Sequence, residues 1–380
     1  MRPLPSETDE HRLFRSTMRD FVAREITPFV DEWDEAGSFP RDLYRKAGAL
    51  GVFGIGFAEE HGGLGAHDPH LFVILAEELA LSSGGGVAAS LFSNYIGAPP
   101  IQAAGKPEVQ AEILPAMLAG DVICALGVTE PSGGSDVANL RTTAVREGDV
   151  YVVHGQKTFI TSGVRADYVT TAVRTGGPGA AGVSLLVVPS DLPGYSTTPL
   201  RKMGWWASDT ATIYLDEVRV PARYLLGQEN RGFELIMRNF NFERLFMIAG
   251  MTASARVCFD EALAWAKERQ TFGARLADHQ VIRHKLVEMD RHINATRAWT
   301  AQLVDRVAAG ESPVAELAEC KVQASLTMEF CAREAAQVLG GASYLRGNKV
   351  ERIYRDVRVN AIGGGSEEIM RDLAARQLGI

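Results

Sequence analysis

The sequence predicts an α+β fold, in which an N-terminal helical domain and a C-terminal helical bundle flank a middle β-barrel-like domain. Three observations lead to this prediction. Apolar residues recur at helical spacing up to about residue 122, the pattern alternates from Ile123 to about Gly227, and long amphipathic helical patterns then return. A chain of 380 residues is long enough for several cores. We therefore place the domains at residues 1–122, 123–228 and 229–380.

In the N-terminal part, Ser6 is the expected cap of a helix whose apolar positions include Leu13, Phe14, Met18, Phe21 and Val22. Pro40 lies near the start of a second helix, because proline suits the first helical turn. The glycines of residues 62–65 predict a loop. Further helices are expected over residues 71–81 and 107–118.

The middle part reads as short strands. Residues 140–145 and 150–154 flank a turn at Gly148 and predict a hairpin. Other strands are expected over residues 123–128, 168–173, 183–188, 210–215 and 218–220, with an exposed connection at 176–182. Helices are then expected over residues 233–251, 254–269, 280–306, 313–339 and 367–377, a pattern typical of a bundle.

Composition excludes several classes of protein. A net charge of −8 argues against nucleic acid as the main partner, because phosphates require basic side chains. No apolar run has the length that spans a bilayer, and the first residues do not resemble a signal peptide. The four cysteines form no C-x-x-C pair, which is typical of buried thiols in a reducing compartment. We expect a cytoplasmic protein that is not bound to a membrane.

Five motifs carry the functional prediction. Residues 129–136 (TEPSGGSD) form a small-residue loop, whose exposed N–H groups suit anions and flat polar cofactor edges. The others are GQKTFITSG at 155–163, RQTFG at 269–273, QVLGG at 337–341 and GGGSEEI at 363–369. In this order they resemble the acyl-CoA dehydrogenase family over nearly the whole chain. No G-x-G-x-x-G stands between a predicted strand and a predicted helix, which is the context that a nicotinamide-type fingerprint requires.

The resemblance implies FAD as cofactor, an electron-transfer flavoprotein as partner and a homotetramer. The residues that would flank the isoalloxazine are Leu126, Val128, Thr129, Phe159, Ile160 and Thr161, and Ser135 is a further implied cofactor-binding residue. Those that would bind the ADP half, across a subunit contact, are Arg269, Phe272, Gln280, Gln337, Val338, Leu339, Gly340 and Gly341, with Ser366 and Glu368 as a polar pair near the same cofactor. An alternative for residues 337–341 is an ordinary helix end capped by glycine.

Oxidation of a Cα–Cβ bond needs a base for the α proton and an acceptor for the β hydride. Many members of the family carry the base as a Glu in the slot that is Gly364 here. In a second branch, which includes isovaleryl-CoA and long-chain acyl-CoA dehydrogenases, the Glu precedes an Arg on an earlier helix. Glu243-Arg244 stands at that place, so the resemblance implies Glu243 as the base. The implied substrate-binding residues are Ser135, Asn241, Phe242, Arg244, Gly364 and Gly365.

Several alternatives stay open. Glu243 is an ordinary surface carboxylate in the simplest alternative, although its many apolar neighbours argue against that. A flavin oxidase or monooxygenase, or a non-catalytic acyl-CoA-binding protein, would share the fold. Gly84, Gly85 and Gly86 serve either close helix packing or a longer acyl pocket. His61, His67 and His70 lie near one another but lack a metal-ligand spacing, and we expect no metal.

Overall fold

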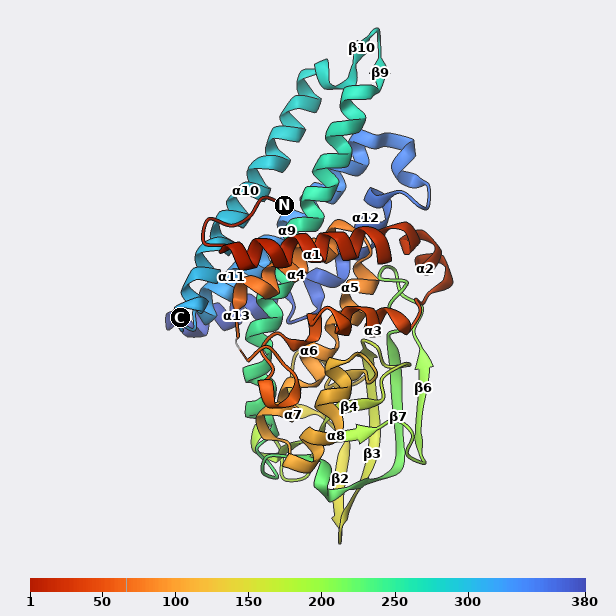
Figure 1. Ribbon diagram of the computed structural model, residues 1–380, viewed down its shortest axis with the longest axis vertical. Helices are drawn as coiled ribbons and strands as arrows, with labels where there is room; N and C mark the ends of the chain where they lie inside the picture. The colour runs from red at the N-terminus through yellow and green to blue at the C-terminus, as the bar shows by residue number, and fades with distance from the viewer. Residues whose placement is uncertain (66) are drawn as a thin grey trace.

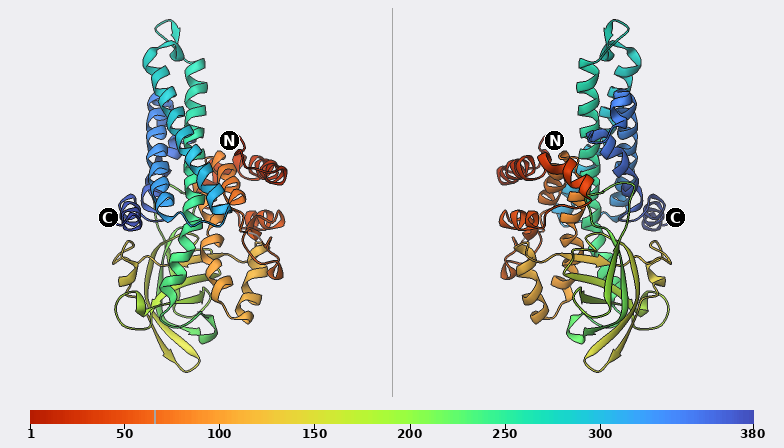
Figure 2. Two further views of the ribbon diagram at one scale, coloured as in Figure 1. Left: turned by 90° about the vertical axis from the view of Figure 1, so that its left-hand side faces the viewer. Right: turned by 90° about the vertical axis from the view of Figure 1, so that its right-hand side faces the viewer.

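The computed structural model describes residues 1–65 and 67–380, and all of their side chains except those of residues 238–242. It has the expected order of a helical part, a sheet and a second helical part. In Figure 1 the sheet lies at the bottom and the C-terminal helices rise to the top. Figure 2 shows helix α9 (Gly232–Glu268) passing from the sheet, beside the N-terminal helices, to the far end of the molecule.

The N-terminal helices begin at identifiable caps. Thr8, rather than the expected Ser6, caps the first helix, because its hydroxyl accepts from His11 N while Ser6 Oγ bonds His70 instead. Pro residues start three others, where the missing N–H has no helical partner. The helices are α1 (Asp9–Glu25), α2 (Val30–Ala36), α3 (Asp42–Ala49), α4 (Pro69–Leu81), α5 (Gly85–Phe92), α6 (Asn94–Gly97), α7 (Pro99–Ala104) and α8 (Pro107–Leu118).

Buried charges join this part to the C-terminal bundle. Helix α4 is buried along nearly its whole length and carries Glu77 and Glu78 into the interior. Arg15 of α1 donates to both carboxylates, at 2.7 and 2.9 Å. Arg297, on α10 (Gln280–Ala308), reaches Glu77 at 3.2 Å. Because each of these buried carboxylates has a guanidinium partner, the network fixes the helices against one another.

The middle domain is one eight-stranded sheet in the order β6-β7-β3-β2-β4-β5-β8, with β1 paired in parallel to β4. The sequence did not predict β6, and it divided β7 into two strands. β3 continues six residues past its predicted end, through the GQKTFI segment. The strands are β1 (Cys124–Gly127), β2 (Thr143–Glu147), β3 (Val150–Ile160), β4 (Tyr168–Arg174), β5 (Val183–Pro189), β6 (Tyr195–Pro199), β7 (Ala211–Pro221) and β8 (Leu225–Leu226).

The C-terminal part differs from the prediction in two places. The helices expected over 233–251 and 254–269 are one helix, α9, which packs on α4, α10 and α11 (Val314–Leu339), so tertiary contacts carry it across the predicted break. Helix α12 (Lys349–Ile362) was not predicted. Helix α13 (Glu367–Leu378) follows it, and a hairpin of β9 (Gln270–Thr271) and β10 (Ala274–Arg275) joins α9 to α10.

The glycines before α5 serve close packing. A β carbon on Gly85 would lie 2.6 Å from Asp356 Oδ2, and one on Gly86 would lie 2.8 Å from Ser208 N. Both glycines therefore let the start of α5 touch α12 and the β6–β7 connection. This contact explains them without a longer ligand pocket. Among the helices that the structure describes, none has the length and apolar character of a membrane span.

Candidate active site

Glu243 and Gly364 come together although 120 residues separate them. Glu243 lies in α9, one turn before Met247, and Gly364 lies in the connection between α12 and α13. A β carbon built on Gly364 would be 3.6 Å from Glu243 Oε1 and would overlap the Met247 sulfur. The carboxylate on the helix therefore reaches the place from which a side chain at 364 would begin.

The environment of Glu243 favours its neutral form. Burial raises the pKa of this carboxyl to about 7, and the opposing charges of Arg244 and Lys321 offset burial only in part. Among the described residues, none donates a hydrogen bond to the carboxylate oxygens. A carboxylate with a pKa near neutrality can take up a proton at physiological pH, as a general base must.

The neighbours of Glu243 along α9 include an aromatic ring and a buried cation. Phe246, three residues later, stacks on Phe92 with ring centroids 3.7 Å apart. Arg244 is buried, and burial lowers the pKa of its guanidinium against the opposing charge of Glu243. The side chains of Asn241 and Phe242, which the sequence assigns to substrate binding, lie outside the described residues.

The connection that carries Gly364 requires glycine. Gly364 and Gly365 have φ angles of +64° and +95°, where a β carbon is strained. Lys321 Nζ, from α11, donates to the Gly365 carbonyl at 2.8 Å. Ser366 then caps α13 by accepting from Ile369 N, and Glu368 is exposed on the first turn. This glycine pair therefore lies beside Glu243, and the hydrogen bond from Lys321 fixes its backbone.

A second constellation forms in the middle domain. The TEPSGGSD loop follows β1 and meets the end of β3, where Thr158 N donates to Thr129 O at 2.9 Å. A β-bulge between Lys157 and Ile160 turns the Phe159 ring outward, with a φ of +59° and 69% exposure. A cavity of about 350 Å³ adjoins the loop, lined by Val128, Thr129, Ser132, Gly133, Gly134, Asp136, Val137, Asn139, Leu140 and Arg141.

The residues expected at the isoalloxazine are therefore neighbours. Val128 and Thr129 line the cavity, and Leu126 lies just before them in β1. Phe159 and Ile160 end the strand that contacts the loop, and Thr161 follows it. Ser135 is exposed at the loop surface and is not among the lining residues. An exposed aromatic ring beside a small-residue loop fits a flat cofactor, because the ring offers a face for stacking.

The residues expected at the ADP half do not join this group within one chain. Arg269, Phe272 and Gln280 lie at the β9–β10 tip and the start of α10, at the opposite end of the molecule from most of the sheet (Figure 1). Gln337, Gly340 and Gly341 are exposed at the end of α11, where Val338 and Leu339 are buried. The Phe272 side chain is fully exposed. One chain alone does not assemble the nucleotide site that the resemblance implies.

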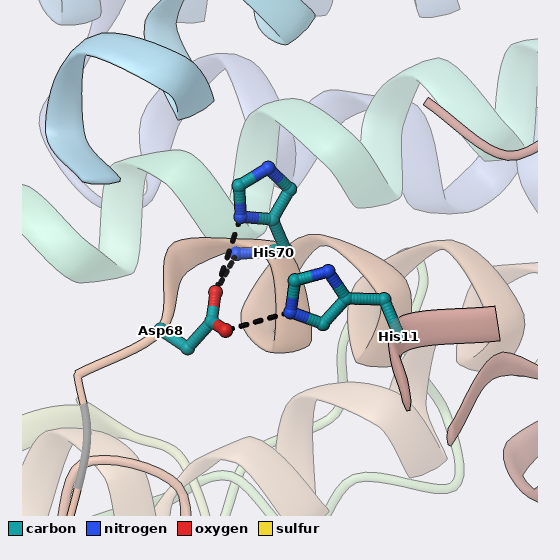
Figure 3. A group of neighbouring side chains, drawn as sticks. All are labelled: His11, Asp68 and His70. Atoms are coloured by element: carbon teal, nitrogen blue, oxygen red, sulfur yellow. Dashed lines mark hydrogen bonds and ion pairs between the residues drawn. The ribbon is translucent and has the colours of Figure 1, made fainter. Parts of the chain in front are cut away.

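The expected histidines do not form one group. His70 instead meets His11 and Asp68 (Figure 3), and the potential ligand atoms of these three lie within 4.8 Å of one another. Thr8 N donates to His11 Nδ1 at 3.1 Å, so the ring proton is on Nε2, which donates to Asp68 at 2.7 Å. His11 thus presents no free lone pair to the cluster. The hydrogen bonds favour a link between α1 and the start of α4 over a metal centre.

Sequence reasoning missed four residues around these sites. Lys157 and Lys321 are fully buried, Glu130 pairs with Lys157 at 2.8 Å, and Met247 lies against Gly364. The available sequence signal was a lysine within an otherwise apolar segment, because lysine is almost never buried without a partner. Met247 gave no such signal, since methionine is common in cores.

Comparison with known proteins agrees with this architecture. Models of the N-terminal, middle and C-terminal domains of acyl-CoA dehydrogenases match residues 8–121, 125–218 and 230–379. The mitochondrial long-chain specific acyl-CoA dehydrogenase of Sus scrofa is 36% identical, over 98% of this chain and 87% of that protein. The crystal structure of a probable acyl-CoA dehydrogenase from Mycobacterium abscessus is 48% identical, with a TM-score of 0.95 over 98% of this chain and 99% of that one.

Two more distant structures bear on cofactor and partner. A glutaryl-CoA dehydrogenase from Mycobacterium smegmatis in complex with FADH2 is 26% identical, with a TM-score of 0.91 over 98% of this chain and 95% of that one. A chain in a structure of the electron transferring flavoprotein of Acidaminococcus fermentans is 29% identical, with a TM-score of 0.93 over 98% and 99%. From the three domain models and these relatives, the chain belongs to the acyl-CoA dehydrogenase family, whose members are FAD-dependent oxidoreductases.

Proposed function

We propose that this protein oxidises the Cα–Cβ bond of an acyl-CoA thioester to the trans-2-enoyl-CoA, with Glu243 as the base. The observation that carries the proposal is the position of the Glu243 carboxylate against Gly364, inside an apolar environment that raises its pKa to about 7. The ionised carboxylate removes the α proton, which is the pro-R proton by resemblance to the family. Backbone N–H groups at Gly364 and Gly365 suit the thioester oxygen, where negative charge develops.

FAD fits the middle-domain constellation, and when bound it supplies the acceptor for the β hydride. Val128, Thr129 and Phe159 would hold its ring system, with Leu126, Ile160 and Thr161 behind them. Arg269, Phe272, Gln280 and residues 337–341 would reach the ADP half from a neighbouring subunit, with Ser366 and Glu368 nearby. The exposure of Arg269, Phe272 and Gln280 at the end of the molecule away from most of the sheet supports this arrangement. The homotetramer and the cytoplasmic location also stay predictions.

An electron-transfer flavoprotein is the proposed acceptor of the electrons. Its support is the likeness to a chain in the Acidaminococcus fermentans electron transferring flavoprotein structure. For the acyl group, we propose a class of substrate and no single compound. The branch with the base on the helix favours branched or longer chains, and the similarity to long-chain acyl-CoA dehydrogenases points the same way.

The test follows the visible flavin spectrum while acyl-CoAs of varied length and branching are added anaerobically. We expect a yellow protein that one acyl class bleaches. Glu243→Gln should bleach about 10²- to 10⁴-fold more slowly, which is the usual contribution of a general base. Glu234→Gln is the matched control, because Glu234 lies on the same helix but is exposed and pairs with Arg231. It should behave as the wild type.

Three outcomes would contradict parts of the proposal. Bleaching of Glu243→Gln at the wild-type rate would exclude Glu243 as the base. A yellow protein that no acyl-CoA bleaches, but whose reduced form reacts rapidly with oxygen, would favour an oxidase or monooxygenase. Failure of the protein to take up FAD would exclude FAD as its cofactor and would favour a non-catalytic acyl-CoA-binding protein.

A further inference from the structure

Lys321 is a buried cation that the proposed chemistry does not yet use. It lies on α11 with no exposed surface, and its ammonium group donates to the Gly365 carbonyl at 2.8 Å. No carboxylate among the described residues forms an ion pair with it. Burying an ammonium group with a carbonyl as its acceptor is unfavourable, so such a group needs a structural or functional reason.

Lys321 and Glu243 both approach the same glycine connection. Lys321 holds the carbonyl of Gly365, while Glu243 Oε1 lies 3.6 Å from the β-carbon position of Gly364. The charge of each acts on the other: Lys321 lowers the pKa of Glu243, and Glu243 raises that of Lys321. The other charged groups that act on Lys321 are Arg244 on α9 and Glu367 and Glu368 on α13.

We propose that Lys321 is a positioning residue for the reaction of Glu243. Its ammonium group holds the glycine pair in place, and its charge favours the ionised carboxylate across that connection. The inference rests on the proposed function, because it gives Lys321 a purpose only if Glu243 is the base. It goes further by assigning the electrostatic control of that base to a residue on a different helix, α11.

Burial lowers the pKa of Lys321 to about 8, against the opposing charges of Glu367 and Glu243. The pair therefore has its reactive charges, an ionised Glu243 and a protonated Lys321, in the window between about pH 7 and pH 8. We expect kcat/KM of the wild type to rise as pH passes about 7 and Glu243 loses its proton.

Three variants separate control of the base from a structural role. Lys321→Met keeps the volume and removes the charge and the donor, so the acid limb of the kcat/KM profile should move up by about one pH unit. Lys321→Arg keeps a cation and should leave the limb within a few tenths of a unit of the wild type. Cys331→Ala removes a fully buried group from the same helix, facing α10, so it should lower Tm without moving the limb.

A second readout does not depend on turnover. The carboxylic acid band of Glu243, identified by its absence in Glu243→Gln, can be followed by infrared difference spectroscopy as a function of pH. In Lys321→Met the midpoint of this band should rise with the acid limb. If Lys321→Met does not fold, Lys321→Gln, which is also uncharged, replaces it in both measurements.

Equal midpoints in the wild type and in the uncharged variant would overturn the inference, whatever their Tm values. A shift in Cys331→Ala as large as that in Lys321→Met would also overturn it, because the effect would then follow from destabilisation. If no acyl-CoA reduces the wild-type protein, the proposed function fails. The infrared titration would still decide whether Lys321 controls the ionisation of Glu243.

Discussion

Glu130 and Glu243 are both withdrawn from solvent and both near a buried lysine, yet their acidities move in opposite directions. Burial would raise the pKa of Glu130, but the charge of Lys157 and the donated hydrogen bonds outweigh it and lower the pKa to about 2. The donors are Lys157 Nζ at 2.8 Å, Thr142 N at 2.8 Å, Arg141 N at 2.6 Å and Ser132 Oγ at 3.3 Å. Burial raises the pKa of Glu243 to about 7.

The difference lies in where each ammonium group points. Lys157 contacts its glutamate directly, so the two charges compensate each other and tie the TEPSGGSD loop to β3. Lys321 contacts the Gly365 carbonyl instead, and its charge reaches Glu243 only from a distance. A lysine in the vicinity is therefore not enough to acidify a buried carboxyl group. The first arrangement suits a structural link, and the second suits a group that must exchange a proton.

The largest effect on stability is expected from breaking the ion pair between Glu130 and Lys157. Lys157→Met leaves Glu130 buried without its cation, and removal of one member of a buried pair typically lowers the free energy of unfolding by about 3–5 kcal/mol. Chemical denaturation at pH 7 measures the loss. The control is Lys46→Met, which breaks a solvent-exposed pair with Glu25 and should lower it far less, because water screens exposed ion pairs. Equal losses of stability in the two variants would show that the buried pair contributes no more to stability than the exposed one.

The pH dependence of Glu130 gives the next effect. Its pKa is lowered on folding, so ionised Glu130 stabilises the fold above its unfolded pKa of about 4.5, by roughly 3 kcal/mol. This contribution is lost as pH falls from about 4.5 towards 2. Glu130→Gln should therefore be much less stable than the wild type at pH 7, with a difference that shrinks in acid. A difference independent of pH would contradict the ionised pair.

The stability contribution of Glu243 should depend on pH in the opposite direction. Its pKa is raised on folding, so the wild type loses stability as pH rises from about 4.5 to 7. Glu243→Gln removes the buried charge and should raise the free energy of unfolding at pH 8 by on the order of 1–3 kcal/mol. At pH 4 the two proteins should be nearly equal. Thermal unfolding at both pH values, without added substrate, makes the comparison, and a variant less stable at pH 8 would disprove the burial argument.

The smallest effect concerns the glycine beside Glu243. Gly364→Ala places a β carbon at a φ of +64° and against the Met247 sulfur, so it should lower the free energy of unfolding by about 1–2 kcal/mol. Gly133→Ala is the control, because its β carbon would meet no atom within 4 Å. It should change stability by less than about 0.5 kcal/mol. Differential scanning calorimetry of both variants measures the change in Tm. Equal changes would contradict the predicted steric clash and strain at position 364.

The sequence predicted the order of helical and β regions because hydrophobic periodicity changes twice along the chain. It did not predict that α9 is continuous or that α12 exists, since contacts with distant helices decide both. Periodicity reports which face of an element is apolar, but it does not report which elements meet. The false break predicted between residues 251 and 254 and the missing α12 have this same origin.

Prediction of the site had a similar limit. Family resemblance indicated Glu243 and the loss at 364, but only the folded chain shows that the two positions adjoin. Lys321 lies between Cys320 and Val322 in a helix that the sequence did predict, and nothing in that helix shows that its ammonium group reaches Gly365. Distances between segments remote in sequence were the information that periodicity and motifs lacked.

The Met247 side chain has a consequence for how such proteins change over time. The β carbon of a glutamate at position 364 would lie 2.4 Å from the Met247 sulfur, too close without a shift, at a backbone conformation that only glycine adopts readily. Moving the base back to the glycine connection is therefore not a one-step mutational path. The Met247 side chain would have to move aside and the turn would be strained, and losing Glu243 first would remove the carboxylate from this place. The position of the base is in this sense epistatic: the fold permits two solutions, but the neighbouring residues hold this chain in one of them.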